Sequence, residues 1–188
     1  MDKRIVKVTP VYKGWSSMSI VGLRLESGVV VPRHVEDHGL SAGVLPYDPV
    51  RRCATVVRMA RAPVLVAGCE DVIEVPAGKI DQLGPDHTAR QEALEEVGLQ
   101  LRSLERIAEF WSMPAISSER ITLYLGEYGA ENKVAPGGGL EEEGEEIQVI
   151  ELNLDTLWSL VTQSEGVDLK TAMLVYALRL RKPELFSQ

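Results

Sequence analysis

The chain has 188 residues, which is the length of one compact domain with a short extension and too short for two full domains. Apolar residues make up 45% and charged residues 26%, and these ordinary proportions exclude disordered, collagen and coiled-coil classes. The net charge of -8 argues against nucleic acid as a partner, whereas a polyanionic small molecule can still bind an acidic protein through a divalent cation.

The chain has no predicted export or membrane segment. The first residues, MDKRIVKVTPVYKGW, lack an apolar h-region, and no run of about 18 apolar residues is free of charge. We therefore expect a cytoplasmic protein with no membrane partner. The cysteines, Cys53 and Cys69, form no Cys-x-x-Cys pair and predict neither a zinc site nor a disulfide framework. We expect both of them to be buried.

Three strand-like segments occupy the first forty residues. They read KRIVKVTPVYKGW, SMSIVGLRL and GVVVPRHVEDHG, with a hairpin turn at Ser27-Gly28 between the second and the third. We expect residues 1–40 to form a small N-terminal antiparallel sheet, separate from a main domain over residues 41–188.

Further strands follow up to Pro76. Short Val-rich runs bounded by turn residues are typical of strands. They are Ser41 to Leu45, Cys53 to Met59 after a Pro46 to Pro49 turn, and either Val64 to Val66 or Val72 to Val75.

The pattern then becomes helical. Apolar residues recur at offsets of three and four from Asp86 to Leu99, and Gly98 stands where a helix C-cap belongs. Later segments predict strands at 103–111, 121–128 and 147–152 and helices at 155–164 and 168–181. This order predicts an α/β fold with a mixed sheet packed between helices.

Three carboxylates share one face of the predicted helix. At about 100° per residue, Glu95 and Glu96 lie close in angle to Glu92. Like charges at this spacing repel one another, so the face favours a cation, and an oxygen-only ligand set suits Mg²⁺ or Mn²⁺. A solvated acidic helix face is the alternative.

The stretch from Glu74 to Asp81, followed by Arg90 to Leu99, resembles the Nudix hydrolase signature G-x5-E-x7-R-E-U-x-E-E-x-G-U, where U is aliphatic. The matching residues are Gly78, Glu92, Glu95, Glu96, Gly98 and Leu99. Two departures stand out. First, the segment from Gly78 to Glu92 is one residue shorter than in the signature, and Gly84 stands nearest the place of the first glutamate. Second, Gln91 occupies the position of the signature arginine, and Arg90 lies one residue earlier.

The resemblance implies a Nudix α/β/α sandwich that cleaves a nucleoside diphosphate linked to another group. It implies Mg²⁺, with Mn²⁺ as a substitute, held by the Ala77 carbonyl, Glu92, Glu95 and Glu96, the last also taking part in catalysis. The acidic loop from Glu141 to Glu146 resembles the catalytic loop of the family, in which Glu143 matches the general base and Glu145 a further metal ligand. By composition alone, this loop would be solvated and mobile.

Within the family, the chain is most similar to the ADP-ribose and GDP-mannose pyrophosphatases. In that branch the N-terminal strands exchange across a homodimer, so a homodimer through the N-terminal sheet is expected. Physical reasoning agrees, because three short strands make a marginal domain without a partner surface.

The resemblance also suggests the substrate. Asp168-Leu169-Lys170 is typical of nucleoside diphosphate sugar hydrolases, although Asp168 could serve only as a helix N-cap. Candidate contacts to the rest of the substrate are Arg58 and Arg61 for the phosphates, Glu119 for the pocket and Trp15 for the base, each with a structural alternative.

The expected reaction is therefore Mg²⁺-dependent hydrolysis of a GDP-mannose-like nucleoside diphosphate sugar to nucleoside monophosphate and sugar 1-phosphate. Two alternatives stay open. One is an ADP-ribose pyrophosphatase, and the other is a non-catalytic sensor of nucleotide sugars.

Overall fold

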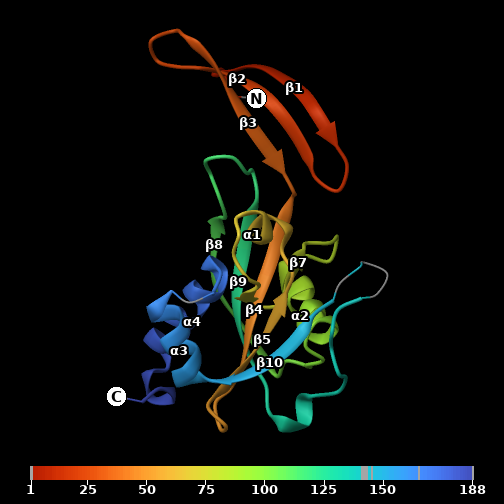
Figure 1. Cartoon of the computed structure of the whole chain (residues 1–188), viewed down its shortest axis with the longest axis vertical. Coiled ribbons are helices and arrows are strands. Elements are labelled where there is room, and N and C mark those ends of the chain that lie inside the picture. Colours follow the sequence, from red (N-terminus) through yellow and green to blue (C-terminus); the bar gives the residue numbers. More distant parts are fainter. Residues whose placement is uncertain (1, 141–143, 145, 165, 188) are drawn as a thin grey trace. The chain divides into compact units, whose positions relative to one another are not determined.

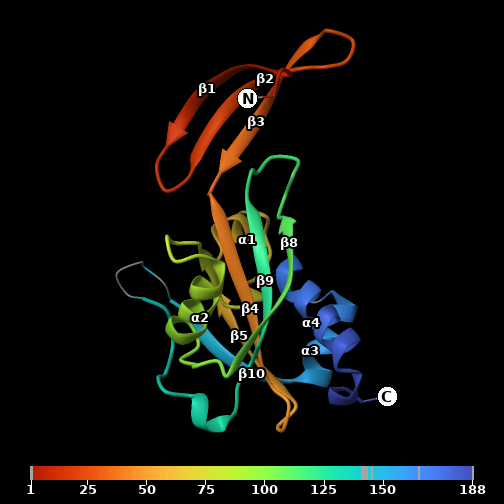
Figure 2. The same ribbon diagram turned by 180° about the vertical axis from the view of Figure 1, so that it is seen from behind.

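The computed structural model describes residues 2–140, 144, 146–164 and 166–187. The chain forms two compact units. One comprises residues 1–41 and 109–121, and the other comprises residues 42–108 and 122–188. Figures 1 and 2 show the elements of both units from opposite sides.

The N-terminal unit contains a three-stranded antiparallel sheet in the order β1-β2-β3. Its strands are β1 (Ile5–Lys13), β2 (Ser17–Arg24) and β3 (Val30–Asp37). Gly28, with φ of 85°, makes the turn between β2 and β3, as the Ser27-Gly28 pair predicts. The small antiparallel sheet expected from the sequence is confirmed.

Residues 109–121 join this unit through backbone hydrogen bonds to β3. The Glu36 amide donates to the Ile116 carbonyl at 2.8 Å, and the Ser118 amide donates to the Glu36 carbonyl at 2.9 Å. Most of β1 is exposed, with Val8 at 44% and Tyr12 at 58%. The unit thus carries apolar side chains that it does not bury.

The main unit is built on a seven-stranded mixed sheet. Its central path runs β10-β5-β4-β9-β8, with β6 paired to β5 and β7 paired to β4. The strands are β4 (Leu40–Asp48), β5 (Cys53–Met59), β6 (Val72–Glu74), β7 (Ala77–Lys79), β8 (Ser103–Trp111), β9 (Arg120–Glu127) and β10 (Gln148–Asn153).

Helices flank the two faces of this sheet. Helix α2 (Pro85–Glu95) lies on one side, and α3 (Leu154–Gln163) and α4 (Leu169–Arg181) lie on the other (Figures 1 and 2). Ala89 and Ala93 of α2 have no exposed surface and pack in one cluster with residues of β4, β5 and β9. The predicted α/β fold is confirmed. None of the described helices is both long and apolar enough to span a bilayer.

Three local predictions need correction. Pro46 to Asp48 belong to β4, since Tyr47 and Asp48 pair with β5, so the turn begins later than expected. Residues Val64 to Val66 lie in the short helix α1 (Ala62–Val66), which has Pro63 in its first turn. The strand is therefore the other candidate, at β6. Cys53 is buried, but Cys69, which follows the turn after α1, is exposed.

Candidate active site

Helix α2 is tied to the sheet at both ends. At its start, the Asp86 carboxylate accepts a 2.5 Å hydrogen bond from the buried Tyr124 hydroxyl of β9. Towards its end, Arg90 Nη1 donates to the Leu101 carbonyl at 2.9 Å. The face of α2 that carries Ala89 and Ala93 is buried in the core. This packing and the two hydrogen bonds hold the helix that carries Glu92 and Glu95 and ends before Glu96.

The Glu92 carboxylate lies directly over the backbone of Gly78. A Cβ added at Gly78 would stand 1.8 Å from Glu92 Oε1 and 2.4 Å from Cδ. Glycine at this position therefore leaves the space that the carboxylate occupies, next to the peptide of Ala77. The structure thus places strand β7, which begins at Ala77, beside Glu92 of α2.

The other two carboxylates differ in exposure. Glu96 is only 4% exposed, whereas Glu95 is half-buried and accepts a 2.9 Å hydrogen bond at Oε1 from Gln91 Nε2. Together with Glu92 and the Ala77 carbonyl, they are the predicted ligands, and they would offer a cation oxygen atoms alone. Such a set fits a hard divalent cation that also binds substrate phosphates.

The acidic loop carries the remaining predicted site residues. Glu143 and Glu145 lie outside the described residues. The chain before the loop is anchored, since the Gly139 amide donates to the Glu95 carbonyl at 3.3 Å. Within the described part of the chain, no three His, Cys, Asp or Glu side chains are grouped closely enough to hold a metal ion.

A buried ionic network lies at the start of α4. Lys170 Nζ contacts the Glu74 carboxylate and, at 2.6 Å, Asp168 Oδ2, while Arg61 Nε donates to Glu74 Oε1 at 2.7 Å. Asp168 is also the N-cap of α4, because its Oδ1 accepts from the Thr171 amide at 3.0 Å. Three predicted substrate residues, Arg61, Asp168 and Lys170, are therefore joined through Glu74.

The charges in this network shift one another's pKa. Burial alone would raise the pKa of Glu74, but the Arg61 hydrogen bond and the Lys170 charge outweigh it and lower the pKa below its usual value. Burial would lower the pKa of Lys170, but Asp168 and Glu74 raise it. Glu74 and Lys170 are thus held in their charged forms at neutral pH.

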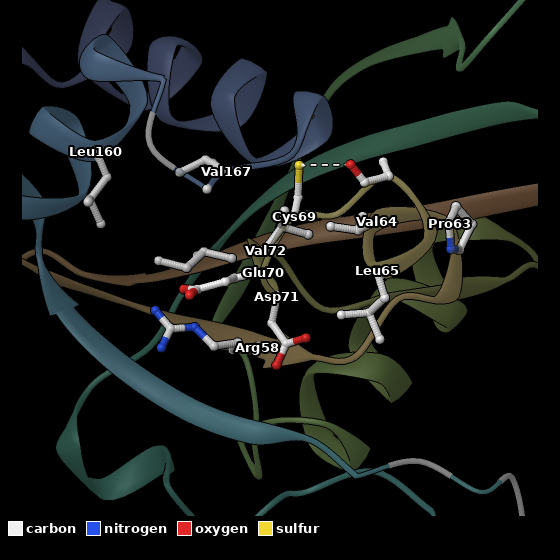
Figure 3. Close-up of a pocket in the computed structure, with 13 residues that line it drawn as sticks. Arg58, Pro63, Val64, Leu65, Cys69, Glu70, Asp71, Val72, Leu160 and Val167 are labelled. Atoms are coloured by element: carbon white, nitrogen blue, oxygen red, sulfur yellow. Dashed lines mark hydrogen bonds between the residues drawn. The ribbon is translucent and has the colours of Figure 1, made fainter.

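Arg58 lies in a different setting from Arg61. It lines a pocket of about 1150 Å³ between α1, β6 and the connection from α3 to α4. Figure 3 shows its guanidinium among mainly apolar side chains, with Glu70 and Asp71 nearby. Of the two predicted phosphate-facing arginines, Arg58 therefore faces this pocket, while Arg61 is bound to Glu74.

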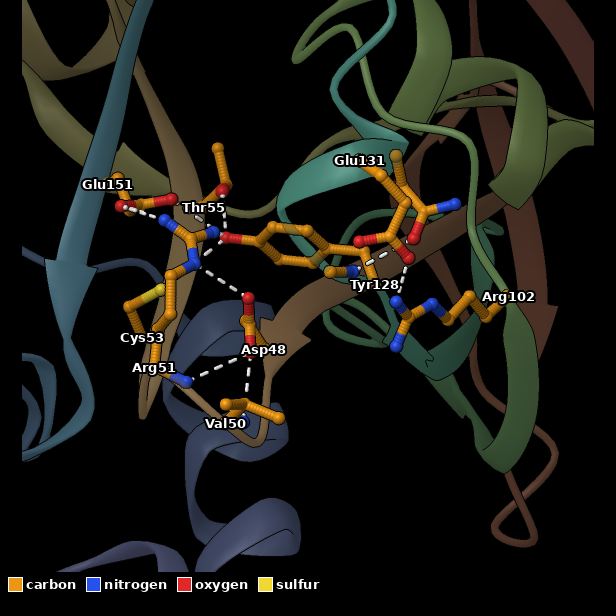
Figure 4. Close-up of polar contacts among 11 residues, drawn as sticks. Asp48, Val50, Arg51, Cys53, Thr55, Arg102, Tyr128, Glu131 and Glu151 are labelled. Atoms are coloured by element: carbon orange, nitrogen blue, oxygen red, sulfur yellow. Dashed lines mark hydrogen bonds and ion pairs between the residues drawn. The ribbon is translucent and has the colours of Figure 1, made fainter.

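A second polar cluster holds the strand that follows the acidic loop. The buried Tyr128 hydroxyl bonds to Thr55 Oγ1 at 2.7 Å and to Glu151 of β10 at 3.1 Å (Figure 4). Arg51 links the same Glu151, at 2.8 Å, to Asp48, at 2.6 Å. Burial raises the pKa of Tyr128, so the hydroxyl stays protonated. This cluster fixes β10 against β5.

Two predicted substrate residues belong to the N-terminal unit. Glu119 accepts hydrogen bonds from Ser41 Oγ at 2.7 Å and Ser112 Oγ at 2.6 Å. Trp15 is 86% exposed, and its ring meets that of His38 edge-on at 5.0 Å. Each therefore has a local structural setting in addition to its predicted role.

Comparison with known proteins shows the family to which the chain belongs. No family model matches the chain. It is 34% identical over 151 residues to a GDP-mannose pyrophosphatase of Cronobacter sakazakii, which covers 79% of this chain and 78% of that protein. A GDP-mannose pyrophosphatase of Salmonella typhimurium is 33% identical over 149 residues, which cover 78% of this chain and 77% of that protein. A GDP-mannose pyrophosphatase of Escherichia coli O1:K1 is 30% identical over 150 residues, which cover 79% of this chain and 78% of that protein. The chain belongs to the Nudix hydrolases, in the branch of the GDP-mannose pyrophosphatases.

Both departures from the Nudix signature have a structural role. Gly84, in place of the first glutamate, is the N-cap of α2 with φ of 92°, and its carbonyl accepts from the Thr88 amide at 3.1 Å. Gln91, in place of the arginine, holds the Glu95 carboxylate, and Arg90 braces the helix instead. The Nudix helix is therefore fixed without the two side chains that the signature would supply.

Two polar residues of this Nudix site were missed from the sequence. Glu74 is the centre of the ionic network. The sequence feature that could have indicated it is a single carboxylate within the apolar run Val-Ile-Glu-Val. Lys133 donates to the Val97 carbonyl at the end of the α2 segment, 2.6 Å away, and no sequence pattern marks it.

Proposed function

We propose that the chain catalyses Mg²⁺-dependent hydrolysis of GDP-mannose to GMP and mannose 1-phosphate. The observation that carries this proposal is the placement of the Glu92 carboxylate over Gly78, one turn from the buried Glu96. The names of the relatives support the choice of substrate. The expected location in the cytoplasm is part of the same proposal.

The Ala77 carbonyl, Glu92, Glu95 and Glu96 would hold Mg²⁺, with Mn²⁺ as a substitute. A divalent cation there would neutralise the diphosphate and stabilise the charge that develops on the phosphoryl oxygens. The role of the carboxylates is to keep the cation at a fixed place against the substrate. Gln91 contributes by orienting Glu95.

The acidic loop supplies the proton acceptor in this proposal. Glu143 takes a proton from the attacking water, which a carboxylate within hydrogen-bonding reach can do, and Glu145 adds a ligand to the cation. The anchoring of Gly139 on the Glu95 carbonyl supports these roles, because the loop begins directly beside the helix that carries the other ligands.

The remaining assignments concern the substrate. Arg58 is proposed to bind a phosphate, and the Asp168 and Lys170 pair to bind sugar hydroxyls, which can both donate and accept. Because Glu74 and Arg61 hold this pair, its geometry is set before the substrate arrives. Glu119 and Trp15 are proposed to contact the nucleotide.

We further propose a homodimer that forms through the N-terminal sheet. The exposed apolar side chains of β1 and of the turn after it support this arrangement, since a partner surface would remove them from water. They are Val6, Val8, Val11, Tyr12 and Trp15.

A substrate panel tests the function. The protein with Mg²⁺ is incubated with GDP-mannose, ADP-glucose, UDP-glucose and ADP-ribose, and the products are separated by anion exchange. The proposal predicts GMP and mannose 1-phosphate from GDP-mannose at the highest kcat/KM. A preference for ADP-ribose would favour the ADP-ribose pyrophosphatase alternative, and binding without turnover of any compound would favour the sensor.

A further inference from the structure

The C-terminal end of the Nudix helix and the residues that follow it are covered by the chain segment that leads into the acidic loop. The carbonyls at the end of a helix have no partners inside the helix. Here four consecutive carbonyls, from the last residue of α2 to Gly98, accept hydrogen bonds from residues 133–139, which we call the strap. The Glu95, Glu96, Val97 and Gly98 carbonyls accept from Gly139 N at 3.3 Å, Gly138 N at 2.9 Å, Lys133 Nζ at 2.6 Å and Val134 N at 2.9 Å.

Glycines make this contact one of backbone against backbone. A Cβ at Gly98 would stand 2.0 Å from the Ala135 carbonyl oxygen, and a Cβ at Gly137 would stand 2.5 Å from the Glu96 carbonyl oxygen. Both residues have positive φ, at 66° and 76°. The backbone of the strap therefore lies directly against the backbone of residues 96–98, with no room for a side chain at Gly98 or Gly137.

Lys133 is the strap residue whose side chain joins these bonds. Its Nζ donates both to the Val97 carbonyl and, at 2.9 Å, to the Pro136 carbonyl, so one ammonium bridges the helix and the strap. A cation is also favoured at the negative end of a helix dipole. Val97 directly follows Glu95 and Glu96, so the bridge acts on the backbone that carries two of the predicted ligands.

We propose that Lys133 is a positioning residue of the divalent-cation site, holding the backbone at Val97, just beyond the end of α2, so that Glu95 and Glu96 keep their places. The inference rests on the proposed function for the identity of the cation site, but not on the identity of the substrate. Groups that orient metal ligands without touching the metal typically contribute about 10–100-fold in affinity or activity.

Direct Mn²⁺ binding tests the proposal without turnover. EDTA-treated protein is titrated with Mn²⁺, and free Mn²⁺ is followed by electron paramagnetic resonance. Lys133→Met keeps the length of the side chain without its charge and should raise the Kd about tenfold, whereas Lys133→Arg can donate to both carbonyls and should restore binding. Arg102→Met, which removes an exposed ion pair with Glu131 near the strap, is the matched control and should bind Mn²⁺ like the wild type.

Steady-state kinetics separate positioning from substrate binding. With GDP-mannose, Lys133→Met should lower kcat at low Mg²⁺ and recover as Mg²⁺ is raised, with KM for GDP-mannose unchanged. Unchanged Mn²⁺ affinity in a folded Lys133→Met protein would overturn the proposal, even if the wild type hydrolyses GDP-mannose. If the wild type binds Mn²⁺ but hydrolyses no nucleotide sugar, the proposed function is overturned. The Mn²⁺ affinities of the Lys133 variants then still decide the role of Lys133.

A second variant covers the case in which Lys133→Met does not fold. At Gly138 a Cβ would meet only the Ile147 carbonyl oxygen at 4.0 Å, so Gly138→Ala acts on the strap through its φ of 115°. This variant should also weaken Mn²⁺ binding, with circular dichroism reporting that the fold is kept. Wild-type affinity in Gly138→Ala would contradict the role of the strap.

Discussion

Gly78 has no side chain, and the Glu92 carboxylate occupies the space where a Cβ would lie. Gly78→Ala would bring a Cβ to 1.8 Å from Glu92 Oε1, and the flexible end of Glu92 would move away. We expect the variant to fold, because Gly78 does not have a positive φ, but to lose Mn²⁺ affinity and activity by about tenfold or more. Gly22→Ala, whose Cβ would make ordinary contact with Val30 Cγ1 at 3.4 Å, is the control. Equal Mn²⁺ binding by both variants and the wild type would refute this account of Gly78.

The general base is a second test at the scale of one residue. Glu143→Gln keeps the shape of the side chain and removes its ability to accept a proton, so kcat should fall by about two to four orders of magnitude. Glu146→Gln, in the same loop, should have a small effect. The measurement is kcat for GDP-mannose at saturating Mg²⁺, and a Glu143→Gln enzyme with wild-type kcat would remove Glu143 from this role.

At the scale of elements, the Glu74 network joins β6 to the start of α4. Because the pKa of Glu74 is lowered in the folded protein, its contribution to stability is present above the pKa of an unfolded glutamate and is lost as the pH falls through the folded value. Glu74→Gln leaves the largely buried Lys170 without one of its two carboxylate partners and Arg61 without its partner. It should lower the free energy of unfolding by about 3 kcal/mol at pH 7, where breaking buried pairs typically costs this much.

Urea unfolding at a series of pH values checks this expectation. The difference between the wild type and Glu74→Gln should shrink below about pH 4.5, as Glu74 becomes protonated in the wild type. Glu131→Gln removes the exposed partner of Arg102 and should change stability by less than about 1 kcal/mol. A Glu74→Gln difference that is the same at pH 7 and pH 3.5 would contradict the network's role.

At the scale of the whole molecule, the exposed face of β1 predicts self-association. Light scattering after size exclusion at micromolar concentration should give a mass of about 41 kDa, twice the 20.7 kDa of one chain. Val8→Asp places a charge on the exposed apolar face and should shift the protein to the monomer mass. Val50→Asp, at an 85% exposed position in a turn of the main unit, should remain a dimer. A monomeric wild type would contradict the proposed assembly.

The sequence predicted the regular elements well where periodicity was strong. The bounds of Cys53–Met59 and Ser103–Trp111 are confirmed residue by residue, and α2 begins one residue before the expected segment and ends within it. Proline misled the interpretation at Pro46, which lies inside β4 near its end. At Val64 to Val66 the β-branched residues favoured a strand, but Pro63 lies in the first turn of a short helix there.

The site was predictable only as far as its contacts are local. The shared face of Glu92, Glu95 and Glu96 follows from helix geometry, and Asp168 as an N-cap follows from the nearby amides. The contacts of Glu74 with Lys170 and of Lys133 with Val97 join residues far apart in the chain, 96 and 36 positions. No local pattern encodes such pairings, so they required the structure.

The central claim is that a divalent cation held by the α2 carboxylates makes this chain a pyrophosphatase. Its most direct test is the rate of GDP-mannose hydrolysis as Mg²⁺ is titrated into EDTA-treated wild-type and Glu96→Gln proteins, followed by ³¹P NMR. The wild type should show a saturable dependence on Mg²⁺ and yield GMP and mannose 1-phosphate, and Glu96→Gln should be slower by about a hundredfold or more, since metal stabilisation contributes several kcal/mol. Hydrolysis that proceeds equally without Mg²⁺, or equally in Glu96→Gln, would contradict the account.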